Sequence, residues 1–194
     1  VSAYALISST IGSYRILLIG VAEGMQPLAS KAYGASQNGN ATPAERIAAY
    51  DEIRHIRNKA IRTAIAASVL LFLFTIATAS FYPALYGYQG DAAAAGYHAV
   101  MLTAAQLIFT GIVRVTNSFF YAVGKNRYSL FMIYFDPLCL TPAALAVLPH
   151  FFGTDGIWLT AVITQFLLNL VAAGMFVRHN AQMKREQAAL TKGV

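Results

Sequence analysis

Ionisable side chains lie well inside otherwise apolar stretches at Arg15, Glu23, Arg114 and Asp136. A charge that faces lipid is costly, so such groups normally face protein or water and mark ion pathways or gates. A proline follows each acid, and a proline inside a helix frees a backbone carbonyl and bends the helix. We therefore predict a gate or an ion-coupling site at Arg15, Glu23 and Asp136, on helices kinked at Pro27 and Pro137.

The depth of these groups suggests that they interact. At about 1.5 Å per residue, Arg114 and Asp136 lie roughly 12 Å from the basic ends of their expected helices, and Glu23 lies roughly 15 Å from its own. A buried charge needs a partner. We expect Arg114 to pair with Asp136 or Glu23, either as a structural lock of a gate or around a carboxylate that takes up a proton or a sodium ion.

A polar stripe runs along the apolar segment 96–123. Its members are four, four, three and four residues apart, which places them on one helical face: Gln106, Thr110, Arg114, Asn117 and Tyr121. In a membrane this face contacts protein or water. Two interpretations remain open: hydrogen bonds that hold the bundle together, or the wall of a substrate cavity to which Gln165 and Asn169 also contribute.

The composition indicates a membrane protein. Of 194 residues, 57% are hydrophobic and only 11% are charged, whereas a soluble domain has about 25% charged residues. The net charge of +6 resides in short segments between apolar runs, which is typical of membrane topology and not of nucleic-acid binding. The predicted fold class is all-α, a polytopic bundle of transmembrane helices.

About five apolar segments are long enough to cross a bilayer, at 1–33, 60–82, 96–123, 128–149 and 157–177. Segment 34–59 is a charged loop in which Thr42 and Glu45 form a capping box. The helix that starts there either lies on the membrane surface or extends into the next span. We divide the chain into a lobe of transmembrane helices, 1–178, and a frayed or disordered tail, 179–194.

The basic residues predict the orientation. Segment 34–59, the turn Gly124–Arg127 and the tail hold nearly all lysines and arginines, while the loops around Asp91 and Asp155 hold none. The positive-inside rule then places the basic side and the carboxy terminus in the cytoplasm, for a protein of the plasma (inner) membrane. The chain starts at Val1 in an apolar stretch, so we expect a carboxy-terminal fragment whose amino-terminal part is missing.

Enzymatic motifs are not found. The sequence has no G-x-S-x-G, no phosphate-binding glycine loop and no Cys/His metal spacing, and its four histidines are scattered. We expect no catalytic residues, no metal and no cofactor. Cys139, the single cysteine, lies in an apolar run and is assigned to packing.

Three motifs resemble the carboxy-terminal lobe of MATE (multidrug and toxic compound extrusion) transporters. The first is G-x-x-Q-P-x-x-S-x-x-x-G-A, from Gly24 to Ala35. The second is the tight turn Gly124–Arg127, and the third is L-P-x-F-F-G-x-x-G-I-W, from Leu148 to Trp158. Asp136 departs from the pattern, since an uncharged residue is expected beside that proline.

The resemblance implies a secondary transporter. It would export small organic cations or drugs, or amphipathic compounds, by alternating access and in exchange for protons or sodium ions. Membrane lipids would surround it, and the amino-terminal lobe of the same protein would be its missing partner.

Three alternatives stay open. A flippase for a lipid-linked oligosaccharide would need a wide cationic cavity, and Arg15 and Arg114 are the intramembrane cations available. An intramembrane enzyme would need a dyad, for which Glu23 with Asp136 is the candidate pair. A non-transporting scaffold would use the polar stripe for packing alone.

Overall fold

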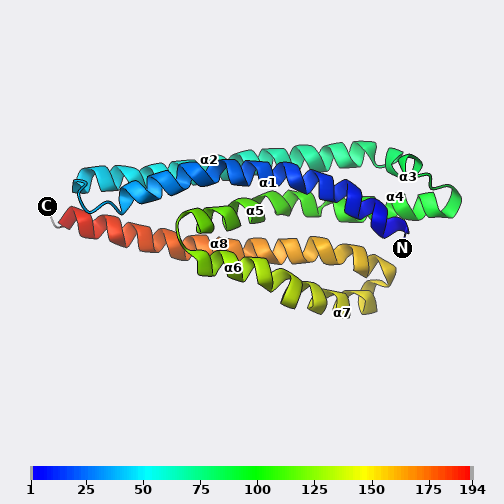
Figure 1. The fold of residues 1–194 in the computed structure, drawn as a ribbon. Coiled ribbons are helices and arrows are strands. Elements are labelled where there is room, and N and C mark those ends of the chain that lie inside the picture. The colour runs from blue at the N-terminus through cyan, green and yellow to red at the C-terminus, as the bar shows by residue number, and fades with distance from the viewer. Residues whose placement is uncertain (1, 193–194) are drawn as a thin grey trace.

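The structure, a computed structural model, describes residues 2–192. Val1, at the start of the first expected span, and 193–194, at the end of the expected tail, lie outside the described residues. The elements, shown in Figure 1, are α1 (Ser2–Ser36), α2 (Pro43–Thr78), α3 (Phe81–Leu85), α4 (Gly90–Ala104), α5 (Gln106–Ala122), α6 (Asn126–Phe135), the π-helical turn η1 (Asp136–Leu140), α7 (Thr141–Phe152) and α8 (Thr154–Lys192).

The lengths of these helices confirm the expected membrane bundle. Four spans are long and apolar enough to cross a membrane: Tyr4–Ser36, Pro43–Thr78, Asn126–Phe152 and Thr154–Thr191. Helices α4 and α5 pass the same test together, with a bend of 43° between them, and bring the total to five. The segment expected as one helix at 96–123 is thus two helices.

Helix α2 starts at the predicted capping box and continues without a break. The Thr42 backbone N–H donates to Glu45 Oε2 at 2.7 Å, and the Glu45 N–H donates to Thr42 Oγ1 at 3.3 Å. No separate surface helix forms at 42–59, because Tyr50 and Ile53 are buried against protein at 3% and 1% exposure. The charged loop 34–59 is therefore reduced to the connection 37–42.

Helix α8 continues through the segment expected as a tail. It reaches Lys192 without a break, so the tail is helical up to that residue and is neither frayed nor disordered there, whereas the division at 178 stays a prediction. Helices α2 and α8 run on together beyond the turn between α5 and α6 (Figure 1). Contacts with α2 stabilise this extension, and they explain why a segment without apolar periodicity is helical.

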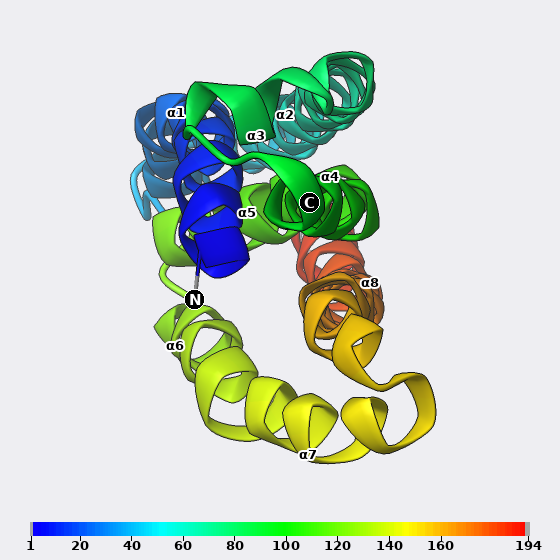
Figure 2. The same cartoon turned by 90° about the vertical axis from the view of Figure 1, so that its right-hand side faces the viewer.

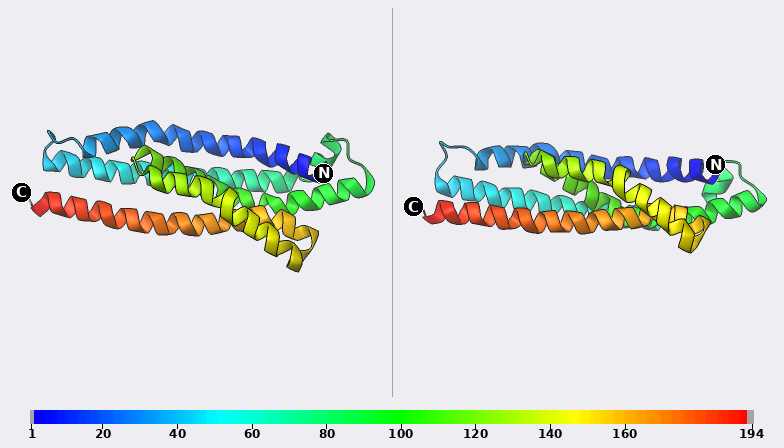
Figure 3. Two further views of the ribbon diagram at one scale, coloured as in Figure 1. Left: turned by 60° about the horizontal axis from the view of Figure 1, so that its bottom comes forward. Right: turned by 90° about the horizontal axis from the view of Figure 1, so that it is seen from below.

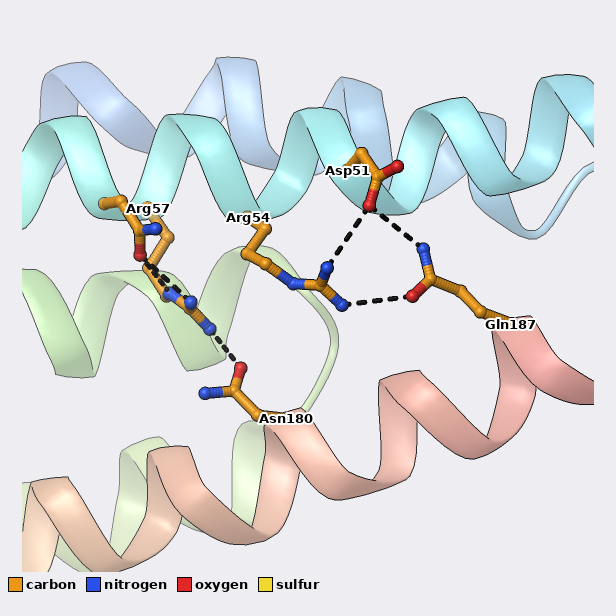
Figure 4. Close-up of polar contacts among 6 residues, drawn as sticks. Asp51, Arg54, Arg57, Asn180 and Gln187 are labelled. Carbon is orange, nitrogen blue, oxygen red and sulfur yellow. Dashed lines mark hydrogen bonds and ion pairs between the residues drawn. The ribbon is translucent and has the colours of Figure 1, made fainter.

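These contacts form what we call the α2–α8 clamp (Figure 4). Arg57 donates to Asn180 Oδ1, and Arg54 Nη2 donates to Gln187 Oε1 at 3.0 Å. Gln187 Nε2 donates to Asp51 Oδ1 at 3.2 Å. The Tyr50 hydroxyl adds a bond to Glu186 at 2.8 Å. The clamp comprises Tyr50, Asp51, Arg54 and Arg57 on α2, and Asn180, Glu186 and Gln187 on α8.

The two prolines predicted to kink their helices have different surroundings. Pro137 lies in η1, where the N–H of Thr141 bonds to the carbonyl of Asp136, and this π-helical turn separates α6 from α7. Pro137 and Pro142 both lack an N–H, and a wider turn accommodates the carbonyls that they leave free. Pro27 lies inside α1, which remains helical through it and curves along its length (Figure 3).

The core joins α5 to its neighbours. Phe119 and Phe120 are fully buried, and the Phe120 ring stacks on Phe176 of α8 with centroids 5.3 Å apart. On its other side α5 meets α2 so closely that a Cβ at Gly111 would lie 2.9 Å from the carbonyl oxygen of Ala64. In the end view of Figure 2, α1 and α2 lie on one side and α6–α7 on the other, with α4–α5 and α8 between them.

Candidate functional site

Two adjoining cavities lie among α1, α4–α5, α6–α7 and α8, on the side where Figure 2 shows α1 facing α6 and α7. The larger, which we call the central cavity, measures about 390 Å³, and the smaller, which we call the arginine pocket, about 110 Å³. Both are lined by Arg15, Asp136 and Gln165. These three residues come from α1, η1 and α8, so the site depends on three elements that are distant in sequence.

Asp136 is bonded to neutral donors. Its Oδ1 accepts from the Thr141 hydroxyl at 3.0 Å, and its Oδ2 accepts from Gln165 Nε2 at 3.1 Å. The side chain of Gln165 is 6% exposed on α8. The π-helical turn thus presents Asp136 to α8, and the bond from Gln165 connects the interrupted helix α6–α7 to α8, whereas the bond from Thr141 joins η1 to the start of α7.

Arg114 lines the arginine pocket beside Arg15 and Asp136, and the charges of both residues act on it. The expected ion pair of Arg114 with Asp136 or Glu23 does not form. Within residues 2–192, neither Arg15 nor Arg114 has an ion pair or a side-chain hydrogen bond. The oxygens of Asp136 accept hydrogen bonds from Gln165 and Thr141 instead.

Glu23 lies away from the site. It is exposed on α1, whereas Ala22 and Met25 are buried, and it lines neither cavity. Equal depth therefore did not bring Glu23 to the arginines, because it points from another face of its helix. The acid pair considered for an intramembrane enzyme, Glu23 with Asp136, is not part of one cavity.

Some residues of the polar stripe line the cavities, and another is buried in the packing between helices. Gln106 lines the central cavity, and Arg114 and Asn117 line the arginine pocket. Thr110 is 1% exposed and its hydroxyl donates to the carbonyl of Gln106 at 2.9 Å, so it serves packing.

Two further residues expected in the cavity wall have other environments. Asn169 Nδ2 donates to the carbonyl of Phe109 at 3.0 Å, which connects α8 to α5, and Asn169 lines neither cavity. Tyr121 is 61% exposed and also lines neither. Thr110, Asn169 and Tyr121 therefore line neither of these two cavities, and their place in the wall of a substrate cavity stays a prediction.

Several wall residues of the central cavity were not expected from the sequence: Tyr4, Thr103, Thr141, Leu145, Trp158 and Thr160. Trp158 had been noted only as the last residue of the third motif. Thr160 and Thr164 both line the cavity at a spacing of four residues, and this helical period next to Gln165 is the signal that could have identified this face of α8.

A second polar cluster lies near the α2–α8 clamp. A cavity of about 40 Å³ there is lined by residues that include Lys125, His179, Gln182 and Glu186. His179 is 3% exposed, and neither of its ring nitrogens has a hydrogen-bond partner in the described part of the chain. Its ring packs edge-on against Phe119 and Phe120, with both centroid distances at 5.6 Å.

No family model matches the chain, and no curated protein matches it. Two solved structures do: outward-facing and inward-facing conformations of a multidrug resistance MATE family transporter of the MOP superfamily. Both matches cover 98% of this chain and 39% of the other, with TM-scores of 0.76 and 0.73 and identities of 15% and 17%. At such identities the likeness shows the fold. The chain therefore has the fold of part of a MATE transporter, as its motifs predicted.

Proposed function

We propose that this chain is part of a secondary transporter. It exports amphipathic organic compounds, small organic cations or drugs among them, by alternating access and in exchange for protons or sodium ions. The observation that supports this best is the central cavity, walled by α1, α4–α5, α7 and α8. It occurs in a fold shared with transporters solved in both outward- and inward-facing conformations.

The chemistry of the central cavity suits an amphipathic ligand. Small-molecule sites are mostly apolar, with a few polar groups that fix orientation, and measure about 300–1,000 Å³. Here Tyr4, Leu145 and Trp158 supply apolar surface. Arg15 and Gln165 supply polar groups on the opposing helices α1 and α8.

Asp136 and Arg15 are our candidates for a gate. Asp136 connects η1 to α8 through Gln165, while Arg15 faces it from α1 across both cavities. A movement of α6–α7 relative to α1 changes the width of the central cavity, and the bond between Asp136 and Gln165 opposes that movement. We therefore expect the gate to depend on the acceptor charge of Asp136.

The whole transporter needs more than this chain, which spans 39% of the length of the similar structures. We propose that an amino-terminal lobe supplies the opposite wall. The basic end, where α1 meets α2, lies in the cytoplasm of a plasma-membrane protein. Membrane lipids cover the outward-facing apolar side chains of α2, such as Leu70, Leu73 and Phe74.

Proteoliposomes that contain the full-length protein test this proposal. Efflux of a cationic dye is measured under an imposed proton gradient and then under a sodium gradient. We expect efflux that requires one of the gradients and that slows in Asp136→Asn, with Asp91→Asn as the exposed control. Efflux of equal rate without any gradient would exclude ion coupling, and an unchanged rate in Asp136→Asn would remove Asp136 from the gate.

A flippase of lipid-linked oligosaccharides is the second candidate. The observation in its favour is that Arg15 and Arg114 place two cations in one pocket that a phosphate could contact. The same vesicles, loaded with a fluorescent lipid-linked sugar, distinguish the two functions. Flipping without dye efflux would replace the exporter with a flippase.

A further inference from the structure

The arginine pocket contains two positively charged side chains, and only one of them, Arg15, belongs to the proposed gate. Arg15 and Arg114 reach it from α1 and α5, and neither has a hydrogen bond or an ion pair within residues 2–192. Each guanidinium offers a planar set of N–H donors that matches the oxygens of a carboxylate, sulfonate or phosphate. The donors are thus present and unoccupied.

The charge balance of the pocket favours an anion. Two arginines and Asp136 give its charged lining a net charge of +1. Within residues 2–192, Asp136 forms no ion pair with either arginine, and its oxygens accept from Thr141 and Gln165. Two like charges that share a site inside an apolar bundle repel each other. An anion between them would replace this repulsion with attraction to both arginines.

A neutral donor completes the pocket. Asn117 lines it and accepts a hydrogen bond from the Ser129 hydroxyl through Oδ1 at 2.6 Å. Its amide N–H groups are therefore left for a ligand. A cavity of about 110 Å³ also exceeds the roughly 10–15 Å³ that a single water needs, so an oxyanion group has room.

The neighbouring cavity defines the rest of the ligand. The arginine pocket adjoins the central cavity, where Tyr4, Leu145 and Trp158 provide apolar wall. A molecule with an apolar body in the central cavity would place a polar end group at Arg15. We propose that the arginine pocket binds the oxyanion of an amphipathic substrate, a carboxylate, sulfonate or phosphate, rather than a cationic end group. This proposal rests on the proposed export function and names amphipathic anions as the substrate class that the arginine pocket recognises.

Equilibrium binding to the purified full-length protein in non-ionic detergent tests the proposal. The probes are a naphthalene sulfonate and a naphthyl trimethylammonium ion, which share an aromatic body and differ in charge. We expect calorimetry to show binding of the sulfonate at least tenfold tighter than that of the ammonium ion. A charge-assisted hydrogen bond corresponds to a factor of roughly ten or more, so Arg114→Gln and Arg15→Gln should each weaken sulfonate binding by about that factor.

The controls separate binding from folding. Arg62→Gln removes an exposed arginine of α2 and should leave the sulfonate affinity unchanged. Arg114→Lys keeps a positive charge and should retain part of the affinity, with all variants compared by thermal melting. Asp136→Asn removes the competing negative charge and should strengthen sulfonate binding, although it slows export. A merely structural role of Asp136 would not produce this increase.

The results distinguish the two proposals. If the ammonium ion binds as tightly as the sulfonate, or if both glutamine variants bind the sulfonate normally, the anion pocket is wrong. Gradient-driven efflux of a cationic dye would then still support an exporter. Arginine-dependent sulfonate binding without efflux of any dye would support the pocket and refute the export function.

The source of the oxyanion is tested in nanodiscs. If phosphatidylglycerol competes with the sulfonate in wild-type protein but not in Arg114→Gln, a lipid phosphate is a ligand of the pocket. If neutral and anionic nanodiscs bind the sulfonate equally, the oxyanion comes from a free organic substrate. Either result supports the oxyanion pocket.

Discussion

Asp136 and Arg114 show how strongly hydrogen-bond partners decide the role of a buried charge. Both line one pocket, and their opposite charges act on each other. Even so, Asp136 bonds to Thr141 and Gln165, and among residues 2–192 Arg114 has no hydrogen-bond or ion-pair partner. The acid therefore stabilises the arrangement of helices, whereas the base is available to a ligand.

Gly156 is a residue whose small size the structure requires. A Cβ there would lie 2.5 Å from the carbonyl carbon and oxygen of Leu148, which is backbone and cannot move aside easily. We expect Gly156→Ala to destabilise the protein by about 1–3 kcal/mol, as overpacking does. Thermal unfolding of the purified protein measures this loss.

Gly174 in the same helix is the matched control, because nothing lies within 4 Å of a Cβ built there. Gly174→Ala should be neutral or stabilising by up to about 1 kcal/mol, since alanine favours a helix over glycine. Equal changes in stability for the two substitutions would show that the close approach of Gly156 to Leu148 does not affect the free energy of unfolding.

His179 is a second residue with a measurable consequence. Its ring is buried and its nitrogens have no partner, which costs free energy that an apolar side chain would not. We expect His179→Leu to raise the free energy of unfolding by about 1 kcal/mol. Chemical denaturation measures it, with exposed His55→Leu as a control that should change little. A destabilised His179→Leu would indicate that the ring nitrogens bond to water in the adjacent cavity.

At the scale of elements, the clearest feature is the α2–α8 clamp. Arg57 is 6% exposed, whereas Asp51 and its ion-pair partner Arg54 have side chains 61% and 31% exposed. A buried charge that loses its partner costs more than a surface contact does. The clamp should therefore derive most of its stability from the contact between Arg57 and Asn180.

This difference can be measured with two alanine substitutions. Asn180→Ala should destabilise the protein by about 1–3 kcal/mol, because it removes a partner of a buried guanidinium. Gln187→Ala removes contacts that are part-buried at Arg54 and exposed at Asp51, and it should cost less than about 1 kcal/mol. Thermal unfolding of both variants tests the order. A larger loss for Gln187→Ala would reverse our ranking within the clamp.

The same elements show what the sequence could predict. The capping box at Thr42 and Glu45 is local chemistry, and both of its bonds are present. The helical extension after Arg178 was not predictable in this way, because its stability comes from contacts with α2 that are distant in sequence. A pattern within one segment does not contain the partner that stabilises it.

The candidate site was predictable to a similar degree. The spacing of the polar stripe identified the face that carries Gln106 and Arg114. It did not indicate how far a cavity extends along that face, so Tyr121 was included although it is exposed. The expected pairing of Arg114 with Glu23 is not formed for a related reason, since depth along a helix does not determine the direction of a side chain.

At the scale of the molecule, the orientation in the membrane is the property that charge predicts. Lysines and arginines gather where α1 meets α2, at the α5–α6 turn and along the end of α8, while α4 and the α7–α8 junction carry none. The positive-inside rule therefore predicts that the end with the lysines and arginines faces the cytoplasm.

Cysteine labelling checks this orientation. In a full-length background without other cysteines, Asp91→Cys and Ala188→Cys place exposed thiols at opposite ends of the bundle. A membrane-impermeant maleimide added to intact cells should label the thiol at 91. It should label the thiol at 188 only after permeabilisation. The opposite pattern would invert the topology, together with the direction of transport assigned to the chain.

The π-helical turn η1 also sets the rotational phase of α7. An α-helix turns by about 100° per residue, so a helix that contains one wider turn presents a different face beyond it. Thr141 and Leu145 line the central cavity in the phase that η1 gives them. Ordinary α-helical winding of all the residues from Asp136 to Leu140 would rotate both side chains by about 100° out of the wall, whereas deleting one of these residues would let an α-helical turn keep them in place. The number of residues in this turn, as well as their chemical nature, thus specifies which side of α7 a substrate meets.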